Sequence, residues 1–134
     1  MKRKHWTIVI LFLCVFWNIS AQQKSLKSFL NFEEKEIDLG KVVINKEVNC
    51  IFEFENTGKE SLIITRVSAS CGCTTPEWTK APIKKGKKGS LKVVFKSSKK
   101  GVTSKSITVY STAENSPVKL IIKGVVVENN NKDK

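Results

Sequence analysis

The chain has 134 residues, of which 40% are hydrophobic and 27% are charged, and its net charge at pH 7 is +12. That length suits one domain, and the composition is that of a globular protein. After residue 21, Arg66 is the only arginine among the lysines, and no set of aromatic residues accompanies the basic ones. This composition argues against a nucleic-acid-binding protein, because arginines and stacking aromatics usually carry such binding.

Residues 1–21 have the three parts of a secretory signal peptide. Basic residues at the start precede an apolar run from Trp6 to Trp17, and a polar, small-residue stretch follows up to Ala21. The apolar run is shorter than the ~20 residues that a membrane-spanning helix needs. We therefore expect cleavage near Ala21, export of the remainder, and no stable membrane span afterwards. An uncleaved membrane tether is the alternative.

Cleavage at this point changes the chemistry of the exported chain. It removes the only His, the only Met, two of the three Trp and Cys14. The net charge falls from +12 to +9, because the segment holds three of the 24 basic residues and none of the 12 acidic ones. Without histidine, Ser-His-Asp and Cys-His nucleophilic sites are unavailable. The thiols of Cys50, Cys71 and Cys73 are then the obvious reactive groups.

The rest of the chain is expected to contain one folded domain. We predict a flexible lead-in at residues 22–31, a β-sandwich at residues 32–128 and a disordered polar tail at residues 129–134. Within the predicted sandwich, apolar and polar residues alternate with the period of two that is typical of half-buried strands. No helical period is visible. The segment therefore predicts strand after strand.

The predicted strands are short and are separated by turn signals such as Asn56-Thr57-Gly58. In chain order they cover residues 32–39, 48–55, 62–67, 91–96, 107–111 and 118–127. A loop that starts at Cys71-Gly72-Cys73 and runs through Trp78 to Pro82 interrupts the series. Because the strands show no βαβ alternation, they predict an all-β, immunoglobulin-like sandwich of about seven antiparallel strands.

Three roles are open for the loop at Cys71-Gly72-Cys73. The first is structural, with Gly72 permitting a tight turn and a disulfide fixing the loop. The second is thiol–disulfide redox chemistry, because a bond between Cys71 and Cys73 closes a small, strained ring. The third is the binding of a soft ion such as copper(I) by thiolates. Zinc is disfavoured, since a closed zinc site needs four ligands and the exported chain has three cysteines and no histidine.

Two further residues near the loop have alternative interpretations. Cys50 is predicted to point to the apolar face of its strand as a buried core thiol. Its pairing with Cys71 or Cys73 is less favoured, although it would close a loop of about 22 residues and contribute roughly 3 kcal/mol. Trp78 is predicted to cover one end of the core, and an exposed apolar patch beside Pro76 is the alternative.

Three segments have a recognisable sequence: Glu55–Gly58, Leu62–Ile64 and Ser70–Trp78. They resemble a bacterial family known as domain of unknown function 1573, and the Cys-Gly-Cys-Thr sequence in the last segment is the most specific part. Residues 82–95 and 121–126 also fit, so the similarity covers nearly all of residues 32–127. The resemblance implies an exported immunoglobulin-like domain in the periplasm or at the surface of a Gram-negative bacterium. It implies no established activity.

The residues and the resemblance together predict a non-enzymatic interaction or structural module of the bacterial envelope. Thr74, Pro76 and Trp78 are the candidate partner contacts. Most lysines are expected only to solvate polar strand faces. A partner would be another envelope protein or an anionic cell-surface polymer, which the basic surface would attract. No catalytic residue, cofactor or metal site is predicted. The alternative is a thiol–disulfide redox or copper(I)-handling protein that uses Cys71 and Cys73.

Overall fold

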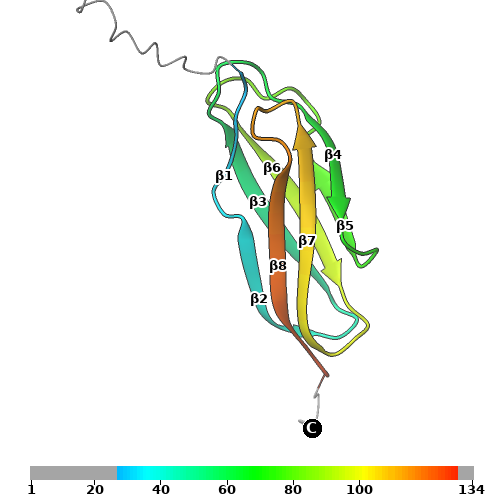
Figure 1. The fold of residues 1–134 in the computed structure, drawn as a ribbon. Coiled ribbons are helices and arrows are strands. Elements are labelled where there is room, and N and C mark those ends of the chain that lie inside the picture. The colour runs from blue at the N-terminus through cyan, green and yellow to red at the C-terminus, as the bar shows by residue number, and fades with distance from the viewer. Residues whose placement is uncertain (1–26, 130–134) are drawn as a thin grey trace, which may run out of the picture.

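The computed structural model describes residues 27–129, which form two four-stranded β-sheets packed face to face (Figure 1). The predicted signal peptide, much of the predicted lead-in and nearly all of the predicted tail lie outside the described residues. The strands are β1 (Leu30–Phe32), β2 (Glu36–Val43), β3 (Glu47–Asn56), β4 (Ile64–Ala69), β5 (Thr74–Trp78), β6 (Lys88–Lys96), β7 (Gly101–Ser111) and β8 (Val118–Val127). The prediction of an all-β, immunoglobulin-like sandwich is confirmed, with eight strands in the described residues instead of about seven. Within residues 27–129, no helix is long and apolar enough to cross a membrane.

Each sheet has two central strands and two edge strands. One sheet has the order β1-β3-β6-β5, and the other has the order β2-β8-β7-β4. The long pairs β3–β6 and β7–β8 are antiparallel and occupy the centres. Among the strand pairs of residues 27–129, only β2 and β8 run parallel. On one side of the sandwich, β5 and β4 are the neighbouring edges of the two sheets.

The core lies between the sheets because each central strand has one apolar face. In β3, Cys50, Phe52 and Phe54 are at most 4% exposed, whereas Ile51 between them is 57% exposed. The inward residues of β6, β7 and β8 complete the layer: Leu91, Val93, Phe95, Ile107, Val109, Leu120 and Ile122. Burying one side chain of this size contributes about 1.5–3 kcal/mol. The period-two pattern in the sequence therefore identifies the inward faces.

The prediction of one strand over residues 32–39 is wrong, because this segment contributes to both sheets. β1 pairs with β3, whereas β2 pairs with β8 in the other sheet. The chain must cross between the sheets, so it leaves the first ladder after Glu33. At Gly40 the backbone has a φ of +62°, and the register with β8 shifts between Asp38 and Lys41. Such a bulge suits glycine, and β2 continues past it to Val43.

Two other boundaries differ from the sequence prediction. β1 begins at Leu30, two residues before the predicted start of the sandwich, and Ser28 is already only 2% exposed. Thr74–Trp78, which was predicted as part of a loop, forms β5. Pro76 lies in this strand because β5 is a sheet edge, where the missing N–H costs no ladder hydrogen bond. The motif-bearing segment is therefore half turn and half edge strand.

The turn after β3 is held by the buried side chain of Asn56, which is fully enclosed. Its Oδ1 accepts hydrogen bonds from the N–H groups of Gly58 at 3.0 Å and Phe29 at 3.3 Å. Its Nδ2 donates to the carbonyl oxygens of Glu60 at 2.6 Å and Ile83 at 2.8 Å. One amide thus joins the segment before β1, the turn itself and the connection between β5 and β6.

Candidate functional site

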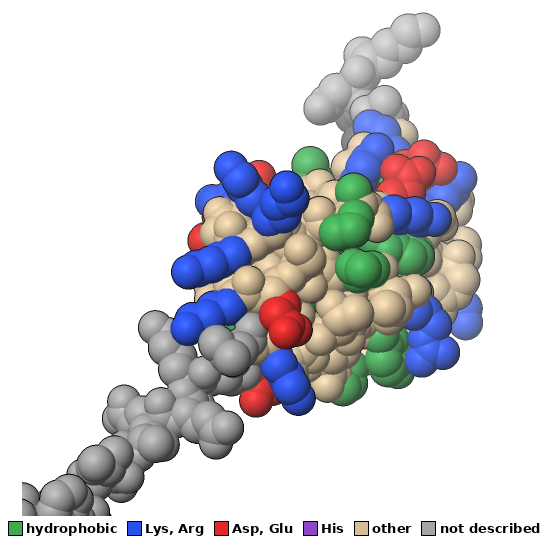
Figure 2. All heavy atoms as spheres, turned by 90° about the horizontal axis from the view of Figure 1, so that it is seen from above, with side chains coloured by type: hydrophobic (Ala, Val, Ile, Leu, Met, Phe, Trp, Pro, Cys, Tyr) green, Lys and Arg blue, Asp and Glu red, His purple; other side chains and the backbone are tan. Residues whose placement is uncertain are grey.

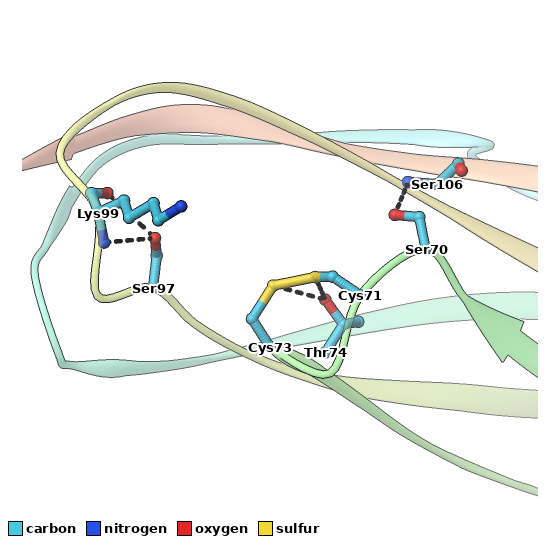
Figure 3. The surroundings of a disulfide bond; sticks show 7 residues. All are labelled: Ser70, Cys71, Cys73, Thr74, Ser97, Lys99 and Ser106. Atoms are coloured by element: carbon cyan, nitrogen blue, oxygen red, sulfur yellow. Dashed lines mark hydrogen bonds between the residues drawn. A yellow bond between two sulfur atoms is a disulfide. The ribbon is translucent and has the colours of Figure 1, made fainter.

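Cys71 and Cys73 form a disulfide in the turn between β4 and β5 (Figure 3). Their Cα atoms are 5.4 Å apart, and both residues are partly exposed. The hydroxyl oxygen of Thr74 lies 3.8 Å from the Sγ of Cys71 and 3.9 Å from the Sγ of Cys73. The bond therefore rests against a buried threonine while part of its surface stays accessible to solvent.

Hydrogen bonds tie the disulfide turn to both sheets. The carbonyl of Cys73 accepts from the N–H of Lys96 at the end of β6, at 3.0 Å. On the other side, Ser70 N–H donates to the carbonyl of Ser106 in β7 at 2.9 Å. Ser106 N–H in turn donates to Ser70 Oγ at 3.2 Å. The turn therefore bridges the edges of the two sheets at a fixed position.

The backbone at Gly72 permits the turn but does not require glycine. Its φ lies outside the left-handed region, and a Cβ added to it would meet no atom within 4 Å. Position 72 is exposed and open. The turn geometry is instead maintained by the disulfide and by the hydrogen bonds on either side of it.

The prediction that Cys50 is a buried core thiol is confirmed. Cys50 is free and 4% exposed, and Cys71 pairs with Cys73 instead. Burial raises the pKa of the Cys50 thiol above its ordinary value. A thiol that stays protonated is a poor nucleophile and a poor metal ligand. Among residues 27–129, no group of three or more His, Cys, Asp or Glu side chains lies close enough to hold a metal ion.

We expect removal of the disulfide to cost little stability. The Cys71→Ser/Cys73→Ser variant should lose about 1–2 kcal/mol of unfolding free energy, because a bond between cysteines two positions apart restricts the unfolded chain only slightly. Guanidinium denaturation of the variant and the oxidised protein measures the difference. A loss near 4 kcal/mol would contradict this expectation and show that the disulfide supports more than its own turn.

The three candidate partner contacts have different surroundings. Thr74 is 5% exposed, so its side chain offers little surface to a partner. Pro76 is half-buried in the edge strand. Trp78 packs against the main core cluster, in agreement with the prediction that it covers one end of the core. Lys80 Nζ lies 5.1 Å from the centre of the Trp78 ring, a cation–π distance. Within the described residues, the buried Nε1 of Trp78 has no hydrogen-bond partner.

A groove of about 650 Å³ lies beside the disulfide turn. Its walls come from the disulfide turn, from the β2–β3 and β6–β7 turns, from the neighbouring ends of β3, β5 and β6, and from the first half of β7. The lining residues are Asn45, Glu47, Gly72, Cys73, Thr75, Val94, Lys96, Ser97, Ser98, Lys99, Lys100, Gly101, Val102, Thr103 and Lys105. Four lysines and one acid are therefore in this wall. This groove was not predictable from the sequence, because its residues come from separate segments.

Within residues 27–129, two of the groove lysines are paired with acids and two are not. Lys96 Nζ lies 3.7 Å from Glu47, and Lys100 Nζ lies 2.5 Å from Glu128. Neither Lys99 nor Lys105 forms an ion pair with any residue in the 27–129 segment. Exposed ion pairs contribute little to stability. The groove thus retains positive charge that is available to an anionic ligand.

Positive charge alone does not single out this groove. Seen from the upper end of the molecule, Figure 2 shows Lys and Arg side chains around much of the visible outline, with hydrophobic side chains gathered toward one side. Positive side chains are thus spread over much of this face. What distinguishes the groove is the combination of lysines, a concave shape and the adjacent disulfide.

Comparison with known proteins identifies a family and a fold. A family model described as protein of unknown function (DUF1573) matches residues 30–126. Comparison with the curated proteins gives no significant match. A solved structure of a protein of unknown function from Porphyromonas gingivalis W83 is 14% identical, with a TM-score of 0.65 over 81% of this chain and 51% of that one. The chain therefore spans about half the length of that protein.

Two other similar structures come from a human protein and from a bacterial protease. An ASH/PapD-like domain of human CEP192 is 10% identical, with a TM-score of 0.66 over 82% of this chain and 93% of that domain. The VesB protease of Vibrio cholerae is 14% identical, with a TM-score of 0.58 over 72% of this chain and 31% of that protein. At such identities the likeness shows the fold alone, because one sandwich architecture hosts many activities.

Proposed function

The chain belongs to the DUF1573 family of proteins of unknown function, and on that premise we propose that it is a non-enzymatic interaction module of the envelope of a Gram-negative bacterium. The signal at residues 1–21 exports it to the periplasm or the cell surface. There the groove beside the Cys71–Cys73 disulfide contacts an anionic partner, either an envelope protein or a cell-surface polymer. The observation that carries the proposal is the lysine-lined wall of this groove.

The groove suits recognition by charge. Lys99 and Lys105, which make no ion pair within residues 27–129, can attract an anion without first breaking an internal contact. At 0.15 M salt the screening length is about 8 Å, so the attraction acts mainly within the groove and its rim. The disulfide turn is fixed to Lys96 and Ser106, so that wall is already ordered before binding. Binding should accordingly weaken as salt concentration rises.

Charge reversal inside and outside the groove tests this proposal. The Lys99→Glu/Lys105→Glu variant should lose the envelope components that the purified protein captures from a Gram-negative envelope extract. Lys92→Glu/Lys119→Glu is the matched control, because it makes the same charge change at exposed strand positions outside the groove. Quantitative mass spectrometry compares the captured material. Equal capture by the groove variant and the original protein would refute the groove as the contact surface.

A second candidate function is thiol–disulfide exchange, and the partial exposure of Cys71 and Cys73 favours it. A dithiol of a partner would attack one sulfur, form a mixed disulfide and leave as a disulfide, while Cys71 and Cys73 become thiols. The reduced pair would then be available to a soft ion such as copper(I).

Thiol counting separates this candidate from the binding module. The protein is equilibrated with glutathione buffers of increasing reducing strength, and its thiols are alkylated after unfolding and counted by mass spectrometry. One thiol throughout, from Cys50, excludes an exchange function. A change from one to three thiols within the range of glutathione buffers supports it. Copper(I) that remains bound to the reduced protein but is lost in Cys71→Ser supports the metal version.

A further inference from the structure

The first half of β7 has an open edge. β4 ends at Ala69, opposite Ile107, and the Ser70–Ser106 hydrogen bonds extend the pairing by one residue. β7 itself begins six positions before Ile107, at Gly101. In that stretch its pairing with β8 continues without a break. On the opposite edge, no strand of residues 27–129 pairs with Gly101–Lys105.

The backbone groups on this edge can be assigned from the register. In an antiparallel sheet, the N–H and C=O of one residue point to the same neighbouring strand, and successive residues alternate. Ser106 directs both groups toward Ser70. Val102 and Ser104 therefore direct theirs to the open edge, while Thr103 and Lys105 direct theirs to β8. Within the described part of the chain, no hydrogen-bond partner reaches the edge groups of Val102 and Ser104.

The open edge borders the lysine-lined groove. Val102, Thr103 and Lys105 all contribute to its wall, together with Gly72 and Cys73 of the disulfide turn. Figure 3 shows the disulfide between the Ser97–Lys99 turn and the Ser70–Ser106 contact. A strand placed in line with β4, beside Gly101–Lys105 of β7, would thus run past the disulfide toward Lys99. Val102, which is 88% exposed, would lie along its path.

We propose that the open edge of β7 accepts an extended acidic polypeptide segment of a partner as an additional β-strand. This inference rests on the proposed function and names the class of partner for the same groove. The backbone of the segment pairs with Val102 and Ser104, which supplies affinity, and its acidic side chains meet Lys99 and Lys105, which supplies selectivity. Residues on one face of a strand repeat every ~6.6–6.8 Å, so alternating acids can follow the lysines.

The observations favour an acidic polypeptide over the other occupants. N–H and C=O groups that alternate along an edge match a second polypeptide backbone, and a polysaccharide has no equivalent spacing. A second copy of this chain would bring the same lysines to the edge and would be repelled. Lysines beside an open edge are also a common means of preventing pairing with unsuitable strands. Carboxylates on the incoming strand would be attracted to these lysines, so an acidic strand can pair where other strands are repelled.

Defined probes test strand addition directly. One probe is a fluorescein-labelled peptide of about seven residues that alternates Glu and Thr, and its twin carries N-methyl groups on alternate peptide bonds. The third probe is polygalacturonate, an anionic polysaccharide. The unmodified peptide should bind, and N-methylation should weaken it at least about tenfold because it removes backbone pairing. In amide hydrogen exchange followed by NMR, the N–H groups of Val102 and Ser104 should become protected.

Protein variants add matched tests of the same edge. Lys105→Glu should weaken peptide binding at least about tenfold, whereas Lys119→Glu, on an exposed face of β8, should leave it within about twofold. Ser104→Pro removes one open-edge N–H and no hydrogen bond of the β7–β8 ladder, so it should weaken the peptide but not polygalacturonate. The N-methylated peptide gives the same information if this variant fails to fold.

The outcomes separate the inference from the proposed function. If both peptides bind equally and the Val102 and Ser104 amides stay unprotected, strand addition is wrong although the groove still binds anions. If polygalacturonate binds and neither peptide does, the partner is a polymer and the inference is likewise overturned. If none of the three probes binds, the inference and the anion-binding groove both fail. Discrimination between the two peptides, with protection of both amides, supports the inference.

Discussion

Replacing Asn56 by alanine is expected to lower the free energy of unfolding by about 4 kcal/mol or more. The Asn56 amide makes four hydrogen bonds to main-chain groups, two through Oδ1 and two through Nδ2. Alanine leaves those groups without partners in a closed site, and each buried unsatisfied group costs about 1–3 kcal/mol. The groups lie in three separate segments, so one substitution loosens all three.

Guanidinium denaturation followed by tryptophan fluorescence measures this effect. Asn49→Ala is the matched control, because Asn49 lies in the same strand with its side chain exposed, and it should change stability by less than about 0.5 kcal/mol. Asn56→Asp refines the test. It keeps an acceptor for Gly58 but places a carboxylate against the carbonyls of Glu60 and Ile83.

The aspartate variant also has an expected pH dependence. Those carbonyls disfavour the ionised form, so folding raises the pKa of the new carboxyl. The unfolded state then loses its proton first as pH rises. The variant's loss of unfolding free energy, relative to the protein with Asn56, should therefore grow with increasing pH and shrink on acidification. A loss below about 1 kcal/mol in Asn56→Ala would mean that the four main-chain groups find other partners.

Gly58→Ala should produce the second large loss of stability, about 3 kcal/mol. A Cβ at this position would lie 2.2 Å from the carbonyl oxygen of Lys27 and 2.5 Å from the amide nitrogen of Phe29. Both are main-chain atoms, so no side-chain rotation relieves the clash. The segment before β1 must move, and overpacking of this kind costs roughly 1–3 kcal/mol before the lost contacts are counted.

The same exchange at Gly72 is the control for Gly58→Ala. Position 72 is open to solvent, and Gly72→Ala should change stability by less than about 0.5 kcal/mol. Hydrogen exchange locates the damage, because Thr57 N–H donates to Phe29 and Lys59 N–H donates to Lys27. Both amides should lose protection in Gly58→Ala. If they stay protected while stability is unchanged, the segment before β1 has room that the structure does not show.

Much of the fold was predictable from the sequence, because the alternation of inward and outward side chains along a strand is visible in a short stretch of residues. The alternation around Phe52 and Phe54 identified β3, and it placed Cys50 inside before any pairing was known. The division of residues 32–39 was not predictable in this way. Both halves place a few apolar residues, Phe32 in one and Ile37 and Leu39 in the other, among charged ones, and only their different partners, β3 and β8, separate them.

The candidate site was predictable only in part. Cys71 and Cys73 are conspicuous by type and spacing, and their disulfide was among the open interpretations. The groove beside them depends on the different lengths of β4 and β7, which the sequence pattern does not predict. β4 stops at Ala69, whereas its partner β7 starts at Gly101. Lys99 and Lys105 become neighbours of the motif only through that mismatch. Thr74 was expected at the surface because its place in the inward face of an edge strand was not recognised.

The parallel pairing of β2 with β8 has a mechanical consequence. The described chain enters at the upper end of the sandwich and leaves at the lower end (Figure 1). Tension between these two ends pulls β2 and β8 past each other along their common direction. Their hydrogen bonds would then bear the load together, in shear, and would not open one after another as in a peeled hairpin. A domain stretched between an anchor and a partner would resist extension through this pair of strands.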